Sequence, residues 1–210
     1  MSAGGSVSRW GEQQRQAARK GLWRRVLAAL GLNPAARRAD ARAAACAAGA
    51  VGEQRTALLL APLETAGWRV LHDRAIPGAR AANADHVLVS PGARVFVVDS
   101  KLWKSGKGRY QVHGTGGRLW HGQVDRGRAV RSLQYETRLI AQALGVPVQP
   151  VIAIHNAEVA GGGFMVEGIP VVPAARLVEV LVGNDGPRAG GAVWLGELAA
   201  RRLPPYVGRG

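Results

Sequence analysis

The positions of apolar residues along the chain predict a succession of helices and strands. Apolar residues at helical spacing predict helices over about 50–66, 124–144 and 173–183. Shorter apolar runs between turn residues predict strands at 68–72, 86–90, 94–101 and 148–155, two short strands within 163–172 and a hairpin over 108–122. The core order α-β-β-β-α-β predicts an α/β fold in which helices flank a mixed central sheet.

Composition divides the chain into three parts. Residues 49–183 hold nearly all of these elements and are expected to form the compact domain. Residues 1–48 are predicted to be a basic, Ala- and Arg-rich helical appendage, with an amphipathic helix over 21–32 and an Ala-rich helix over 37–48. Residues 184–210 are rich in Gly and Pro and are predicted to be a loosely organised tail.

The most hydrophobic strand, VFVVDSK at 95–101, ends with an acid and a base two positions apart. Because residues two apart in a strand share a face, Asp99 and Lys101 are expected to be neighbours about 7 Å apart at its end. A surface ion pair is one interpretation of this arrangement. A site at which both charges take part in chemistry is the other.

The preceding strand brings a second acid to Asp99 if the hairpin loop has three residues, Pro91-Gly92-Ala93. Asp85 then lies directly opposite Asp99, about 5 Å away at Cβ, where two carboxylates repel unless positive charge lies between them. A divalent cation with oxygen ligands would supply that charge. A two-residue loop would instead put the two acids on opposite faces. A structural interpretation of Asp85 also stays open, in which it only caps a strand or stabilises its loop.

The helix predicted over 124–144 carries a glutamine in its apolar stripe. The stripe consists of Val130, Leu133, Thr137, Ile140, Ala141 and Leu144. Gln134 falls within it, and a buried glutamine needs partners for both ends of its amide. The edge of a metal site would supply them; at the margin of the stripe, backbone or water would do so.

The formal net charge of +14 is concentrated in two stretches. Residues 1–48 carry nine Lys and Arg against two acids, and residues 101–131 carry eight against one. Such charge attracts polyanions, chiefly nucleic acid or an anionic membrane surface. The candidate phosphate contacts are Lys104, Lys107, Arg109, Arg131 and Arg138. Trp103 and Trp120, which are interleaved with basic residues, are expected to pack inward.

Other features predict a cytoplasmic protein. The single cysteine, Cys46, excludes an internal disulfide and fits a reducing compartment. No apolar run approaches the length of a membrane span, and the N-terminus lacks the apolar core of a signal peptide. The five histidines lack the close spacing of a zinc site and are interpreted as structural. Peripheral membrane attachment or protein contact through residues 10–48 stays open as an alternative.

Three segments, in order along residues 49–172, resemble the nuclease-related domain (NERD) family, which is placed in the PD-(D/E)xK nuclease superfamily. They are GEQRTALLLAPLETAGWRVLHD with Gly52-Glu53 opening a helix, ADHVLVSPGARVFVVDSK with Asp85 and Asp99-x-Lys101, and the later helix with Gln134. The resemblance implies a restriction-endonuclease-like fold and hydrolysis of nucleic acid.

The resemblance also implies a metal site. Asp85 and Asp99 would hold Mg²⁺ or Mn²⁺, with the backbone carbonyl of Ser100 as a further ligand, and such hard cations prefer oxygen ligands. Two positions depart from the family's pattern. Asp99 stands where Glu is commoner, one methylene longer, and Ala84 stands where proline would precede Asp85.

Three further residues take roles from the same resemblance. Lys101 would orient the attacking water or stabilise the transition state by its charge. Glu53 would complete the acidic cluster from the first helix, although a first-turn acid favoured by the helix dipole is an equal interpretation. Gln134 would meet the site from the long helix.

The leading hypothesis is therefore a metal-dependent deoxyribonuclease that acts through metal-activated water. One alternative is a nucleic-acid-binding module with the same fold but no activity, because Asp99 does not support productive metal binding. The other is a peripheral membrane or partner-docking protein that acts through its N-terminal helices. The sequence gives no oligomeric state.

Overall fold

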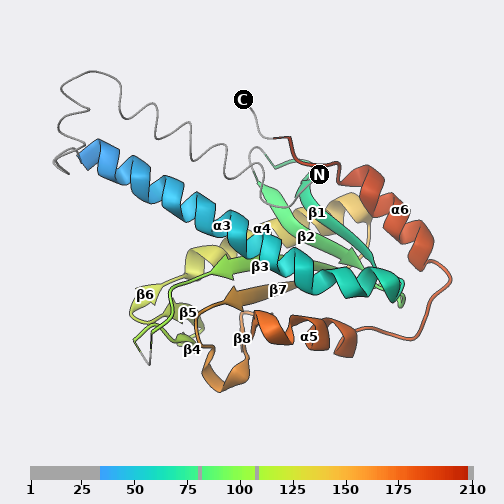
Figure 1. The fold of residues 1–210 in the computed structure, drawn as a ribbon. Coiled ribbons are helices and arrows are strands. Elements are labelled where there is room, and N and C mark those ends of the chain that lie inside the picture. Colours follow the sequence, from blue (N-terminus) through green and yellow to red (C-terminus); the bar gives the residue numbers. More distant parts are fainter. Residues whose placement is uncertain (1–33, 80–81, 107–108, 208–210) are drawn as a thin grey trace.

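The computed structural model describes residues 34–79, 82–106 and 109–207, which form a mixed sheet with helices on both faces (Figure 1). The six-stranded sheet has the order β1-β2-β3-β7-β9-β8. Its strands are β1 (Arg69–Ala75), β2 (Asn83–Val89), β3 (Val95–Leu102), β7 (Val148–His155), β9 (Ile169–Pro173) and β8 (Phe164–Val166). β1, β2 and β3 pair antiparallel, β3, β7 and β9 pair parallel, and β8 returns antiparallel to β9.

Two layers of helices cover the sheet. They are α3 (Pro34–Thr65) and α5 (Leu177–Gly183) on one face, and α4 (Gly127–Leu144) and α6 (Ala192–Arg202) on the other. Leucines from α3 and α5 pack with Phe96 and Val98, whereas α4 and α6 pack over Val95 and Val97. Alternate residues of β3 thus enter opposite cores, as strand geometry requires. The predicted fold, a mixed sheet flanked by helices in a restriction-endonuclease-like arrangement, is confirmed.

A second, small sheet follows β3. It consists of β4 (Val112–Thr115), β5 (Arg118–His121) and β6 (Val124–Asp125). Gly116 and Gly117 both have positive φ, at 59° and 73°, so the predicted hairpin turns through the two residues that adopt this conformation most easily. The helix predicted from 124 begins at Gly127, because Val124 and Asp125 pair with β5 instead.

The helices predicted separately over 37–48 and 50–66 form one helix, α3, which runs past the edge of the sheet (Figure 1). The boundary predicted at residue 48 therefore falls inside a helix. The alanine-rich flanks have high helix propensity, so Gly49 and Gly52 do not end it. The amphipathic helix predicted over 21–32, and most of the 10–48 segment proposed for membrane or protein contact, lie outside the described residues.

The prediction of a loosely organised C-terminal tail is wrong. The segment contains α6, and Leu203 after it is fully buried. The Arg74 side chain donates hydrogen bonds to the carbonyls of Ala200, at 3.0 Å, and Leu203, at 2.5 Å. The Asp185 carboxylate accepts from the Ser90 hydroxyl at 2.5 Å, beside the β2–β3 loop. Despite its glycines and prolines, this segment is therefore packed against the rest of the domain.

Within the described segments, no helix has the length and apolar character needed to cross a membrane.

The loop between β2 and β3 has three residues, and its last residue is strained. The Ser90 amide donates to the Arg94 carbonyl at 2.9 Å, which closes the loop around Pro91-Gly92-Ala93. Ala93 has φ of 57°, a conformation that costs an L-residue with a Cβ about 1–2 kcal/mol.

Substituting Ala93→Gly should therefore raise the free energy of unfolding by about 0.5–1 kcal/mol, because strain relief exceeds the added entropy of the unfolded chain. Urea unfolding measures the change. The matched control is Ala66→Gly, since Ala66 has no positive φ, and this variant should lose stability. Equal destabilisation by both substitutions would contradict the strain at Ala93.

Candidate active site

The register of the β2–β3 hairpin brings Asp85 and Asp99 to one place. His86 pairs with Val98 and Val87 with Val97, so the same register extended by one residue sets Asp85 opposite Asp99. The backbone N–H of Ser100 donates to Asp85 Oδ2 at 2.8 Å, which ties the two strand ends together. The prediction that a three-residue loop places these acids on one face is confirmed.

Lys101 lies beside the two acids. Its Nζ is 2.5 Å from Asp99 Oδ1, and both side chains are partly buried. Burial alone would lower the pKa of Lys101, but the negative charges of Asp99 and Asp85 outweigh it and raise the pKa above its usual value. Lys101 is therefore a permanent cation at neutral pH, and it neutralises only part of the negative charge around it.

Glu53 reaches the same place from α3. Gly52 favours this approach, because a Cβ there would lie 3.3 Å from the Cβ of Leu102, a tight contact that would push α3 and the end of β3 apart by a few tenths of an ångström. The Glu53 side chain is 5% exposed, and its Oε2 has no hydrogen-bond partner. Burial, and then the charge of Asp85, raise the pKa of Glu53 to about 8.

The expectation that Gly52-Glu53 opens a helix is wrong, because α3 begins at Pro34 and passes straight through both residues. Glu53 is thus far from the helix N-terminus, where the helix dipole would favour an acid in the first turn. Of the two interpretations of Glu53, the structure supports its membership in the acidic group.

A carboxylate that the sequence did not single out also faces this place. Glu136 is partly buried on α4, between the buried Leu133 and Ile140. Burial, and then the charges of Asp99 and Asp85, raise the pKa of Glu136 to about 8. The sequence does contain a signal for Glu136. It follows a core leucine by three positions and precedes a core isoleucine by four, and this spacing puts it near the buried face of the helix.

Gln134 lies elsewhere. It is exposed on α4 and donates from its side-chain amide to Glu167 Oε2 at 2.8 Å. The interpretation of Gln134 as a buried member of the stripe is wrong, although Val130, Leu133, Ile140 and Leu144 are buried as predicted. Each helical residue turns by about 100°, so Gln134 turns away from the core beside Leu133. The structure brings Glu136 to the site instead.

Glu53, Asp85, Asp99 and Glu136, together with Lys101, are hereafter the acidic cluster. Burial, and then the charge of Asp99, raise the pKa of Asp85 to about 7. Asp99 Oδ2, like Glu53 Oε2, is buried without a hydrogen-bond partner. Two unpartnered carboxylate oxygens, and acids whose ionisation their neighbours oppose, leave the cluster short of positive charge.

This donor set fits a hard divalent cation. Oxygen ligands are what Mg²⁺ and Mn²⁺ prefer, and Mg²⁺ commonly keeps several waters while one or two carboxylates hold it. In the part of the chain that the structure describes, no three or more His, Cys, Asp or Glu side chains are placed so that together they could hold a metal ion. An ion at the cluster would therefore complete its coordination with water or substrate oxygens.

The comparisons with known proteins agree with this geometry. The sequence model of one family, the nuclease-related domain, matches residues 48–155, which include the whole acidic cluster. The chain belongs to the nuclease-related domain family. No curated protein and no solved structure matches it. The family indicates a nuclease-related function, and the predicted membership is confirmed.

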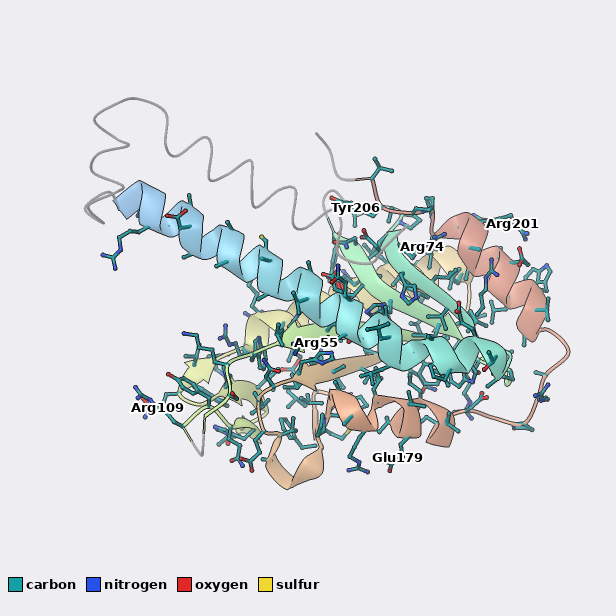
Figure 2. All side chains as sticks on the ribbon, in the orientation of Figure 1. Arg55, Arg74, Arg109, Glu179, Arg201 and Tyr206 are labelled. Carbon is teal, nitrogen blue, oxygen red and sulfur yellow. The ribbon has the colours of Figure 1, made fainter. Side chains whose placement is uncertain are left out.

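The loop that joins β3 to the small sheet of this nuclease-related domain carries cations close to the end of β3. Lys104 and Arg109 are exposed there, and Figure 2 shows Arg109 at the outer end of the molecule, opposite Arg201 on α6. Trp103 is partly buried, packed between the His121 ring, 5.1 Å away, and the Arg126 guanidinium, also 5.1 Å away. Its inward packing is as predicted, and it leaves the cations outward.

The remaining predicted cations divide into three cases. Arg131 is exposed on α4 and lines a pocket of about 430 Å³ between the small sheet, the start of α4 and the β8–β9 turn. Arg118 lines the same pocket and pairs with Asp125 at 3.3 Å. Arg138 is exposed and stacks over Tyr135, 5.5 Å from the ring centroid. Lys107 lies outside the described residues.

Replacing Glu136 by Gln tests the electrostatics of the cluster. With a pKa of about 8 when folded against 4.5 when unfolded, Glu136 stabilises the fold below pH 4.5 and loses that contribution as the pH rises through 8. Glutamine cannot ionise, so E136Q should gain stability relative to the wild type between pH 5 and pH 9, by more than about 1 kcal/mol in metal-free buffer.

Chemical unfolding at several pH values measures this difference. The same exchange at Glu197, which is exposed on α6, controls for the loss of one carboxylate. A difference between E136Q and the wild type that stays constant with pH would show that Glu136 does not face the cluster.

Proposed function

We propose that this chain is a metal-dependent nuclease that hydrolyses DNA phosphodiester bonds. The single observation that carries the proposal is the acidic cluster, in which buried carboxylates with unpartnered oxygens stand beside a charged lysine. A purely structural ion pair would need one acid beside Lys101. Each further acid disfavours the ionised form of its neighbours, so the extra carboxylates are not explained by ion pairing. Family membership agrees, since the matched domain is nuclease-related.

Asp85 and Asp99 would hold the cation, with the Ser100 backbone carbonyl as a further ligand. When bound, Mg²⁺ or Mn²⁺ lowers the pKa of a water and offsets negative charge on the phosphate. The Ser100 N–H, which donates to Asp85 at 2.8 Å, keeps that carboxylate oriented. Lys101 remains charged and presents its ammonium group to charge that builds up on the phosphate in the transition state.

Glu53 and Glu136 stand around this pair with raised pKa values, near 8 in each case. At neutral pH each retains a proton in much of the metal-free population, and added positive charge would favour its release. The two glutamates therefore adjust the charge of the cluster to the charge that it binds.

The cations near the cluster supply the contact with DNA. Lys104 and Arg109 follow β3, and Arg131 with Arg118 lines the pocket at the start of α4. Phosphates flanking the scissile bond would meet these side chains, because the backbone of DNA carries one charge per nucleotide along each strand. The pocket is the proposed seat of one flanking phosphate.

Two observations favour a second candidate, an inactive nucleic-acid-binding module. Lys101 already contacts Asp99 at 2.5 Å, and among the described residues no three His, Cys, Asp or Glu side chains are placed so that they could hold a metal ion. If that ion pair persists in solution, the domain would bind DNA without cutting it.

Incubation of the full chain with plasmid and linear DNA, with Mg²⁺, Mn²⁺ or EDTA, separates the two candidates. D99N and K101M should each lower the rate of cleavage by about 100-fold or more, because each removes charge from the reacting centre. E179Q on α5, at the opposite side of the sheet from α4, is the control and should cleave normally (Figure 2). Unchanged cleavage by D99N and K101M would refute the nuclease assignment.

Salt dependence tests the proposed DNA contacts. The logarithm of the DNA association constant should fall steeply and linearly with the logarithm of salt concentration, because binding releases counterions. R118A and R131A should each make that slope shallower by about 1, whereas R201A, at the far end of the molecule, should not change it (Figure 2). Equal slopes for all three variants would show that the pocket does not contact DNA.

A further inference from the structure

A chain of buried hydrogen bonds lies on the face of β3 opposite the side chains of Asp99 and Lys101. The Ser100 hydroxyl donates to Thr56 Oγ1 at 2.9 Å, and Thr56 Oγ1 lies 2.7 Å from His155 Nε2. Thr56 is 0% exposed, Ser100 4% and His155 8%. The three residues come from α3, β3 and β7, so this chain joins the helix to the ends of two adjacent parallel strands.

Each link of this chain joins groups that can complement one another. The hydroxyls of Ser100 and Thr56 can each donate one proton and accept another, and His155 Nε2 donates or accepts according to its tautomer, so the contacts at 2.9 Å and 2.7 Å can be satisfied together. Burial, and then the charge of Arg55, lower the pKa of His155, which agrees with a neutral ring at pH 7.

Ser100 is the residue between Asp99 and Lys101, and its side chain points to the opposite face from theirs. Its backbone N–H is the donor to Asp85. Contacts that fix the Ser100 side chain therefore also fix the Ser100 backbone. That backbone links Asp99 to Lys101, and its N–H orients Asp85. None of the three side chains in the chain belongs to the acidic cluster itself.

Neighbouring contacts support the same part of the fold. Gly52 packs against Leu102, and Arg55 donates to the side chain of Asn156 at 3.1 Å, directly after His155. The backbone carbonyl of His155 accepts from the Trp103 amide at 3.3 Å. One turn of α3, residues 52–56, thus contacts the carboxyl ends of both β3 and β7, where the acidic cluster lies.

We propose that Thr56 and His155 are positioning residues, which hold the Ser100 peptide so that Asp85, Asp99 and Lys101 keep their mutual geometry. This inference rests on the proposed nuclease function for its effect on rate, but not for its effect on structure. Loss of such supporting hydrogen bonds around metal sites costs about 10- to 100-fold in metal affinity or activity.

The test compares T56V, which keeps the shape of the side chain and loses the hydroxyl, with T56S, which keeps the hydroxyl. T56V should lower kcat with Mn²⁺ by about 10- to 100-fold and leave KM for DNA unchanged. T56S should restore kcat. S100A removes the other end of the contact, and the T56V/S100A double variant should be no slower than the worse single variant, because both break one connection.

Hydrogen exchange gives a readout that needs no activity. In T56V the Ser100 amide should exchange faster than in the wild type, while the Val97 amide in the same strand stays protected. If the wild type cleaves nothing, the nuclease proposal fails, and this exchange measurement still decides the positioning role. If T56V has a lower melting temperature but an unchanged kcat and unchanged exchange at the Ser100 amide, the inference is overturned. If T56V does not fold, the same measurements are made on S100A.

Discussion

The three-residue loop between β2 and β3 is the constraint on which the candidate site depends. Side chains alternate between the faces of a strand, so a shift of one residue in the pairing would turn Asp85 away from Asp99. The chain accepts strain at Ala93, with φ of 57°, to keep this register, and Asp185 from the C-terminal segment caps the loop through Ser90. Residues remote from the cluster thus determine whether its two central acids meet.

The cluster concentrates like charge that the surrounding fold must hold in place. Lys101 neutralises one carboxylate, and burial, together with the repulsion that remains, raises the pKa values of Glu53, Asp85 and Glu136. Packing on both faces of the sheet opposes that repulsion, with leucines of α3 beneath and of α4 above. Sites that bind cations are commonly destabilising when empty of positive charge, and the core supplies the compensating stability.

Local patterns in the sequence predict part of this arrangement. The register of Asp85 and Asp99 follows from strand alternation and loop length, both of which are local. The choice between Gln134 and Glu136 depends on the rotation of α4 by some tens of degrees, which only packing determines. Thr56 and Asp185 act through contacts distant in sequence, and no periodicity marks them. The glycines and prolines after residue 183 predict a loosely organised tail, because composition does not reveal the surface of the domain against which the segment packs.

The length of the side chains explains why the site draws on both helical layers. Asp99 is one methylene shorter than glutamate, so its carboxylate stays near the strand, where Lys101 reaches it at 2.5 Å. The two longer acids, Glu53 and Glu136, come from helices on opposite faces of the sheet. Gly52 favours the close approach of α3 to Leu102, beside Glu53. The negative charge of the cluster therefore depends on how closely α3 and α4 approach the sheet, and not on the strands alone.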